Sequence, residues 1–245
     1  TAKFRVATVW WAAAAVSAGV WVRNGARDEP FEWLGISHFI EHMMFKGTER
    51  RDAKAIAQSL ESLGGHLDAF TAREQVCYYA RALSEHLPDV IDVLADIVCR
   101  SRFAETEVER ERSVVREEIF ACEDNPEDRV NELLNAQVWG EHPRGRPILG
   151  TVETLDRIGP PALMAYFARR YRSENLLVSA VGPLEHERVA ALVDRHFAPP
   201  TGEPMALSAT LPGTSFEGGL KLADRIHRSG RAVVWTGELE LAEHY

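Results

Sequence analysis

The run His38-Phe39-Ile40-Glu41-His42 constrains the fold more than any other feature, because its apolar surroundings indicate an α-helix. On a helix, residues four apart stand about one turn apart on the same face, so His38 and His42 can turn ring nitrogens toward one metal ion. Glu41 projects from nearly the same side. Two imidazoles with a neighbouring carboxylate are the parts of a zinc hydrolase site. The alternative is coincidence: with nine His and 37 acidic residues, a chance match is expected at roughly the few-per-cent level.

A zinc site needs a third protein ligand, and the helical stretch from 105 to 123 offers two carboxylates for it. Its periodicity gives an apolar stripe made of Val108, Val115, Ile119 and Cys122. Glu111 and Glu118 fall on that stripe, whereas Glu117 groups with polar residues. Carboxylates on the buried side of a helix are costly unless a positive group meets them, and a metal with its imidazoles would do so. The alternative is that these acidic residues simply pair with Arg110, Arg112 and Arg116.

The segment from Gly35 to Thr48, GISHFIEHMMFKGT, resembles a known family. It is similar to the inverted-zinc-motif metallopeptidases of the pitrilysin, insulysin and mitochondrial processing peptidase group, and closest to the processing-peptidase-like branch found in bacteria. In that family the third ligand is a Glu 76 residues after the second His, which lands on Glu118. A supporting acidic residue seven positions earlier falls on Glu111. The resemblance thus implies the two carboxylates that the helical stripe had selected.

Further motifs extend the resemblance to about residues 16 to 200. The segment 64–74 looks like the family's Gly-Gly segment leading into an edge strand, and 142–151 looks like its His-Pro-x-Gly-Arg-Pro loop. Residues 166–197 look like the strand and helix that close the first domain. An edge strand can bind an extended peptide as an additional strand, so we expect substrate contacts around Ala69 and Phe70. A core aromatic is the alternative interpretation of Phe70.

Together these patterns predict one Zn²⁺ held by His38, His42 and Glu118. Glu41 would take a proton from the attacking water and return it to the leaving amine, while Glu111 would support catalysis by orienting a ligating imidazole. Manganese or cobalt would also suit this ligand set. A structural zinc site is disfavoured, because such sites close with four ligands rich in Cys.

The predicted fold class is α+β, with a mixed β-sheet packed against helices. Strand patterns occur at 16–22, 76–81 and 176–181. Helical patterns occur at 35–46, 52–63, 84–100, 105–122, 127–138, 160–171 and 185–196. Residues 198–219 are rich in Pro, Gly, Ser and Thr and indicate a linker. We therefore expect a catalytic domain over 1–197 and, from the resemblance, the start of a second homologous domain over 220–245, with a strand at 232–236.

The first 22 residues are less typical. Val6 to Val22 carries no charge, which is compatible with a targeting segment or a short membrane span. Seventeen residues is marginal for spanning, and the second half resembles the family's central strand, so we expect a buried strand pair. The run from Trp10 to Ala15 departs from the family pattern.

Composition excludes some functions. The formal net charge of −9, with no basic stripe, argues against nucleic-acid binding. Cys77, Cys99 and Cys122 lack Cys-x-x-Cys spacing, which favours small buried hydrophobes in a reducing compartment. We expect a cytoplasmic protein, or a mitochondrial-matrix protein in a eukaryote, with no membrane partner.

The resemblance implies a peptide or unfolded-protein substrate and a second homologous half, or a partner subunit, that closes over it. That half is essentially absent here, and length favours a fragment of a longer polypeptide. The alternative function is a catalytically silent homologue that acts as a structural or assembly subunit of a peptidase or respiratory complex. Such relatives typically lose motif residues, and this chain has lost none.

Overall fold

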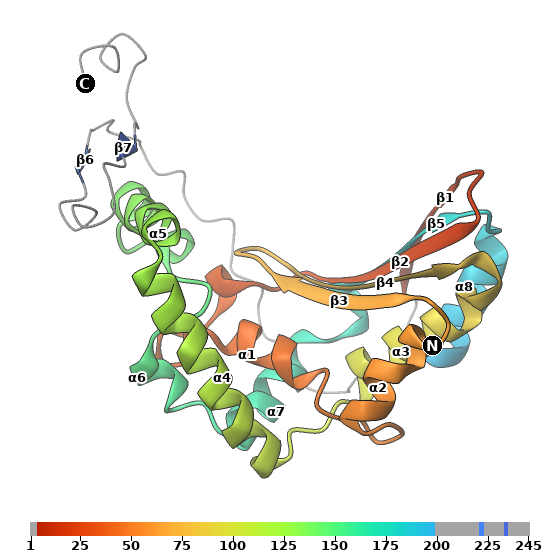
Figure 1. Cartoon of the computed structure of the whole chain (residues 1–245), viewed down its shortest axis with the longest axis horizontal. Coiled ribbons are helices and arrows are strands. Elements are labelled where there is room, and N and C mark those ends of the chain that lie inside the picture. Colours follow the sequence, from red (N-terminus) through yellow and green to blue (C-terminus); the bar gives the residue numbers. More distant parts are fainter. Residues whose placement is uncertain (1–3, 199–220, 223–232, 235–245) are drawn as a thin grey trace, which may run out of the picture.

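The computed structural model describes residues 4–198, 221–222 and 233–234, and Figure 1 shows its elements. The main sheet contains β1 (Arg5–Trp10), β2 (Ala15–Val22), β3 (His66–Thr71), β4 (Val76–Leu83) and β5 (Leu176–Gly182). The helices are α1 (Ile36–Met43), α2 (Ala53–Glu61), α3 (Leu87–Arg100), α4 (Glu105–Asp124), α5 (Pro126–Trp139), α6 (Val152–Leu155), α7 (Pro160–Arg170) and α8 (His186–His196). Each expected helix and strand within 16–197 is present, with ends shifted by a few residues.

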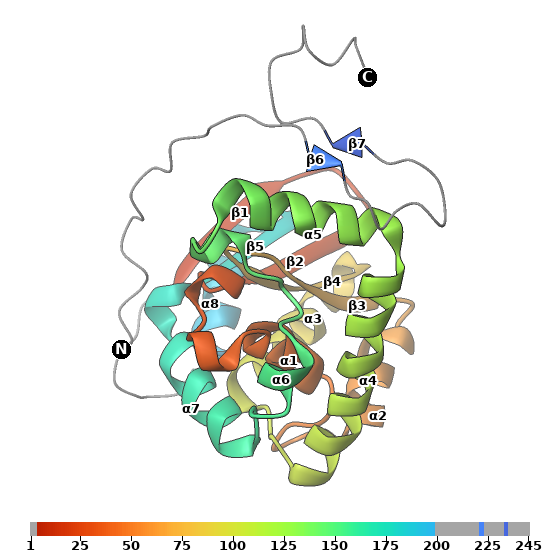
Figure 2. The same ribbon diagram turned by 90° about the vertical axis from the view of Figure 1, so that its left-hand side faces the viewer.

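The sheet is mixed, with the strand order β1-β5-β2-β4-β3. β1 runs parallel to β5, and the other neighbouring pairs are antiparallel. Figures 1 and 2 show α1, α2, α3, α7 and α8 along one face of the sheet, with α4 and α5 rising past the end where β3 leads into β4. This arrangement is the predicted α+β fold.

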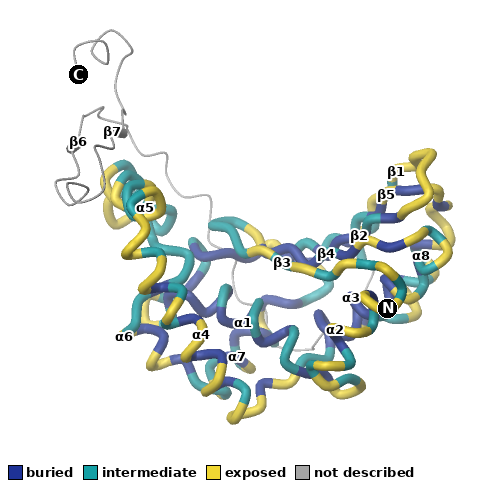
Figure 3. The backbone as a smooth tube through the Cα atoms, in the orientation of Figure 1, coloured by how far each residue is buried: buried dark blue, intermediate teal, exposed yellow. Residues whose placement is uncertain are grey.

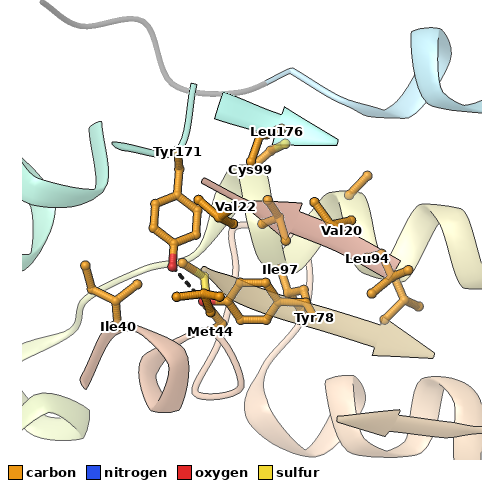
Figure 4. Close-up of a cluster of buried hydrophobic side chains, with 14 of the residues drawn as sticks. Val20, Val22, Ile40, Met44, Tyr78, Leu94, Ile97, Cys99, Tyr171 and Leu176 are labelled. Atoms are coloured by element: carbon orange, nitrogen blue, oxygen red, sulfur yellow. Dashed lines mark hydrogen bonds between the residues drawn. The ribbon is translucent and has the colours of Figure 1, made fainter. Parts of the chain in front are cut away.

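The core lies between the sheet and the helices that cover it, as the burial colouring in Figure 3 shows. Figure 4 shows Val20 and Val22 of β2, Ile40 of α1 and Leu94 of α3 in this core. They are fully buried, because strand residues on the inner side of the sheet and the apolar stripes of the helices remove one another from water. The apolar side chains of α1 therefore hold this helix against the core.

The N-terminal strands differ from the expected buried pair. Both strands form, but β5 lies between them, so β1 and β2 do not pair with each other. β1 is a mostly exposed edge strand, and Trp10 and the following Trp11 are 68% and 65% exposed. Only β2, with neighbours on both sides, is buried as a central strand. Within the described residues, none of the helices is both long and apolar enough to cross a membrane.

Most of the expected linker and second domain falls outside the described residues. In that region the structure shows a short antiparallel pair, β6 (Lys221–Leu222) with β7 (Val233–Val234). β7 lies within the predicted strand 232–236, and the rest of residues 199–245 is outside the described part of the chain.

Two glycines bring the loop before α6 against the start of α1. Gly35 and Gly150 have φ angles of +90° and +75°, in the left-handed region that favours glycine. A Cβ at Gly150 would lie 2.2 Å from the Leu34 carbonyl oxygen, and one at Gly35 would lie 2.4 Å from the Leu149 carbonyl oxygen. The two backbones therefore pack directly on each other, which fixes where α1 begins.

Replacing Gly150 by Ala is expected to destabilise the chain strongly, because it adds a backbone clash to the cost of a left-handed alanine. Gly140→Ala is the matched control, since Gly140 also has a positive φ of 55° but open space around it. The control is expected to lose about 1–3 kcal/mol of unfolding free energy, the usual cost of a residue held in a sparsely populated backbone region, which corresponds to a fall in Tm of roughly 2–12 °C. Thermal unfolding of both variants tests this, and a Gly150→Ala variant no less stable than Gly140→Ala would refute the close packing.

Candidate metal centre

A buried carboxylate holds the first turn of α1. Glu29 accepts hydrogen bonds from the backbone N–H of Gly35 (2.7 Å) and Ser37 (2.8 Å), which have no partner within the helix. Burial raises the pKa of Glu29 to about 8, and the two backbone hydrogen bonds oppose that rise. Phe39 and Ile40 of α1 are fully buried in the core. His38, Glu41 and His42 lie on the other side of the helix and are only partly buried.

α4 presents its two carboxylates differently. Glu111 is buried at 6% exposure, whereas the side chain of Glu118 is 42% exposed. The alternative was that Glu111 and Glu118 pair with nearby arginines of α4, but these arginines pair with other acidic residues. These pairs are Arg110 with Glu107, Arg112 with Glu109, and Arg116 with Asp156. The two carboxylates on the predicted stripe are therefore turned toward α1.

His38, His42 and Glu118 come together at one point. Glu118 Oε2 lies 3.6 Å from His38 Nε2 and 3.4 Å from His42 Nε2, and the three ligand atoms all lie within 4.8 Å of one another. These separations exceed the usual N–H···O distance of about 2.7–3.2 Å. They fit the ligand-to-ligand spacing of about 3.4 Å in a tetrahedron whose metal bonds measure about 2.0–2.1 Å.

The protonation of His38 also fits a metal ligand. Burial, followed by the nearby His42, lowers the pKa of His38 to about 3, so its ring is neutral at physiological pH. A metal binds the neutral imidazole, so the ring is ready to ligate. Its Nδ1 is buried without a hydrogen-bond partner among the described residues, which leaves Nε2 to face Glu118 and His42. Three protein donors are the ligand number of a catalytic zinc site.

Glu111 contacts the ring nitrogen of His42 that does not face Glu118. Its Oε2 lies 3.1 Å from His42 Nδ1, and its Oε1 lies 2.6 Å from the ammonium of Lys46. Glu111 therefore bridges the imidazole of His42 and the ammonium of Lys46. Lys46 did not emerge from the sequence pattern, although its position four residues after His42 could have indicated it.

Glu41 projects into a cleft beside the two imidazoles. The hydroxyl of Thr71 on β3 donates a hydrogen bond to Glu41 Oε2. Burial raises the pKa of Glu41 above its ordinary value, and the Thr71 hydrogen bond opposes that rise. A carboxylate with a raised pKa is a better proton acceptor for general base catalysis near neutral pH. Thr71 also did not emerge from the sequence pattern, although it follows Ala69 by two positions on the same side of the strand.

The cleft has a volume of about 440 Å³ and runs between β3 and α5. Ala69, Phe70 and Thr71 line one wall. Four polar residues of α5 line the other: Asp128, Asn131, Glu132 and Asn135. Among the described strands β3 pairs with β4 alone, so it is an edge strand whose outer side has no partner strand. On β3 the Ala69 N–H donates to the side chain of Asp68 at 2.8 Å. Phe70 is 40% exposed and packs edge-on against Trp21 at 5.9 Å, so it is not a core aromatic.

Cys122 corrects one expectation. Cys77 and Cys99 are buried, as predicted, but Cys122 is only partly buried and lines the cleft with His38 and Glu41. It lies one turn after Glu118 at the end of α4, where the helix rises beyond the core. Burial raises the pKa of its thiol, and nearby acidic residues add to the rise.

Comparison with known proteins places this site in a family context. Residues 5–152 match the family model described as Insulinase (Peptidase family M16). An "Uncharacterized zinc protease" of Mycobacterium leprae is 43% identical over 74% of this chain and 41% of its own length. The "Uncharacterized zinc protease YmxG" of Bacillus subtilis is 45% identical over 68% of this chain and 41% of its own length. The "Probable mitochondrial-processing peptidase subunit beta" of Arabidopsis thaliana is 37% identical over 78% of this chain and 36% of its own length. The chain thus spans about two fifths of the length of these relatives.

Solved structures share the fold at low sequence identity. A protease from Helicobacter pylori has a TM-score of 0.80 and 21% identity, with 84% of this chain and 51% of that chain covered. A structure from Pseudomonas fluorescens described as a peptidase inactive domain has a TM-score of 0.74 and 18% identity, with 85% and 52% covered. The same fold is therefore found in structures described as a protease and as an inactive domain.

Proposed function

The chain belongs to the Insulinase (Peptidase family M16) family, and from that premise we propose that it carries the catalytic centre of a zinc-dependent endopeptidase that cleaves extended or unfolded peptides. The observation that carries the proposal is the convergence of His38, His42 and Glu118, whose ligand atoms all lie within 4.8 Å of one another, with Glu41 lining the cleft beside His38. Relatives named zinc proteases support zinc as the ion.

The mechanism assigns a separate role to each side chain. His38, His42 and Glu118 would hold one zinc ion, and the chemistry that it would supply is that of a Lewis acid for a peptide carbonyl and for the attacking water. Glu41 takes the proton of the attacking water at a carboxylate oxygen and returns it to the leaving amine. Glu111 fixes the orientation of the His42 ring from behind.

Substrate recognition is assigned to the edge of the sheet. An extended peptide would add a strand along the outer edge of β3 around Ala69 and Phe70 and would lie along the cleft. The Ala69 N–H, which donates to Asp68 Oδ1 at 2.8 Å, would exchange that hydrogen bond for one to the peptide. This mode selects extended chains through main-chain hydrogen bonds and favours unfolded substrates over folded ones.

A second half is part of the proposal. Residues 1–197 would form the metal-binding domain and residues from 220 would begin a homologous domain, because the chain spans only 41% of its M. leprae and B. subtilis relatives. The remainder of the polypeptide, or a partner subunit, would close over the peptide opposite β3 and α5.

Thr71→Val is expected to lower kcat for peptide cleavage by about tenfold without changing zinc content. A hydrogen bond to a charged group is worth about 1.5–3 kcal/mol, and Glu41 would lose the contact that aims it at the attacking water. The matched control is Thr106→Val on the exposed face of α4, which should leave kcat unchanged. Equal kcat values for both variants would show that Thr71 does not position Glu41.

The test of the function combines metal analysis with cleavage of an unstructured peptide. The chain should bind one zinc per molecule, and cleavage at internal peptide bonds should stop on chelation and return with zinc. The assay is run with the chain alone and with the remaining half supplied. Bound zinc with no cleavage, even when that half is present, would favour the catalytically silent assembly subunit instead.

A further inference from the structure

Lys46 holds the outer end of a chain of contacts that leads to the metal centre. Its ammonium lies 2.6 Å from Glu111 Oε1, and the other carboxylate oxygen of Glu111 lies 3.1 Å from His42 Nδ1. The remaining ring nitrogen, His42 Nε2, faces Glu118 Oε2 at 3.4 Å. Lys46, Glu111 and His42 therefore form a line that ends at the metal-facing nitrogen.

The charge balance of Glu111 depends on Lys46. The Glu111 side chain is 7% exposed, and a buried carboxylate without a positive partner is strongly destabilising. Among the described residues, the ion-pair partners of Glu111 are His42 and Lys46. A ligating His42 is neutral and offers only an N–H, so the full positive charge must come from Lys46.

The geometry of Glu111 also depends on Lys46. A carboxylate fixed at both oxygens cannot rotate, so Oε2 stays aimed at His42 Nδ1. A carboxylate acceptor at Nδ1 keeps the proton on that nitrogen and leaves Nε2 as the metal donor. Released from Lys46, Glu111 could rotate toward solvent, and the His42 ring would lose its fixed tautomer and direction.

We propose that Lys46 is a positioning residue that strengthens zinc binding at His38, His42 and Glu118 by clamping Glu111 against His42. The inference rests on the proposed zinc function and deepens it. Lys46 contacts Glu111, and Glu111 contacts His42, so Lys46 acts on zinc binding through these two residues.

The experiment measures the zinc dissociation constant of the full chain by competition with a chelator. Lys46→Met is expected to weaken zinc binding by about 10–100-fold, the usual cost of losing a group that supports a metal ligand. Lys46→Arg keeps the charge and a donor and should restore most of the affinity. Lys54→Met, at an exposed position on α2, makes the same substitution away from the site and should leave the affinity unchanged.

A double-mutant cycle separates positioning from general destabilisation. In a Glu111→Gln background, Lys46→Met should have little further effect on the dissociation constant, because the residue through which it acts is already altered. Thermal unfolding of the metal-free chains identifies any variant that lowers affinity only by unfolding, and the Lys46→Arg measurement stands independently of that outcome.

The outcomes distinguish this inference from the function on which it rests. Unchanged zinc affinity in Lys46→Met, or an equal loss with and without Glu111→Gln, overturns the role of Lys46 while leaving the zinc centre intact. Failure of Lys46→Arg to recover affinity, with the chain folded, also overturns it. A wild-type chain that binds no zinc overturns the proposed function and this inference together.

Discussion

Glu41→Gln is expected to lower kcat/KM for cleavage of an unstructured peptide by about 10²–10⁴-fold, the usual contribution of a positioned general base. Gln has nearly the same shape as Glu and can still accept the Thr71 hydrogen bond, but it cannot take the proton of the attacking water. Because Glu41 is not one of the converging ligands, zinc binding should persist. The assay follows cleavage with the complementary half present and zinc content in the same samples.

The outcome for Glu41→Gln separates two errors. A variant that binds zinc and cleaves at the wild-type rate would mean that another group accepts the proton, and the assigned mechanism would be wrong. A variant that loses zinc would mean that Glu41 belongs to the metal's coordination, contrary to the geometry. Glu32→Gln, at an exposed position before α1, is the control for the substitution itself and should behave as wild type.

Glu118→Gln is expected to lower zinc affinity strongly, because it neutralises a direct ligand. Loss of a group that only supports a ligand costs about 10–100-fold in affinity, and the loss here should be larger. Without the metal neither the carbonyl nor the attacking water is activated, so cleavage should fall to background. Glu118 is the carboxylate shared by both imidazoles, at 3.6 and 3.4 Å, so no other single change on α4 should have this effect.

The neighbouring residue provides the matched control for this prediction. Glu117 lies next to Glu118 on α4 and is exposed, so Glu117→Gln removes the same charge without reaching the cleft. It should keep wild-type zinc affinity and activity. Equal effects of the two substitutions would mean that the general negative charge of α4, and not a coordinating oxygen, attracts the metal.

The sequence could predict which residues of α1 and α4 lie on one helix face, because that depends only on their spacing along the chain. The spacing of His38 and His42 fixes a face of α1, and the apolar stripe of α4 selected Glu111 and Glu118 before any contact was known. The side of α4 on which a residue lies follows from the helical period alone. The helical period does not predict that α1 and α4 meet. That expectation came from the spacing between the second His and the ligating Glu in the resembled family.

The features that sequence reasoning missed depend on distant partners. β1 pairs with β5 about 170 residues away, and Arg5 aligns with Leu177, so no local pattern could show which strand would separate β1 from β2. Lys46 and Thr71 acquire their roles from Glu111 and Glu41, which reach them only through packing. The expected burial of Cys122 failed because α4 continues beyond the core and carries that residue to the cleft.

The coordination of the ion is the most direct test of the central claim. X-ray absorption at the zinc edge, on the zinc-loaded chain, should show two imidazole nitrogens and one carboxylate oxygen at about 2.0–2.2 Å with a single water-derived oxygen completing the site. Glu118→Gln should change that spectrum, whereas Glu117→Gln should not. A sulfur ligand at about 2.3 Å, which would implicate Cys122, or a coordination sphere without imidazole would contradict the assignment of His38, His42 and Glu118.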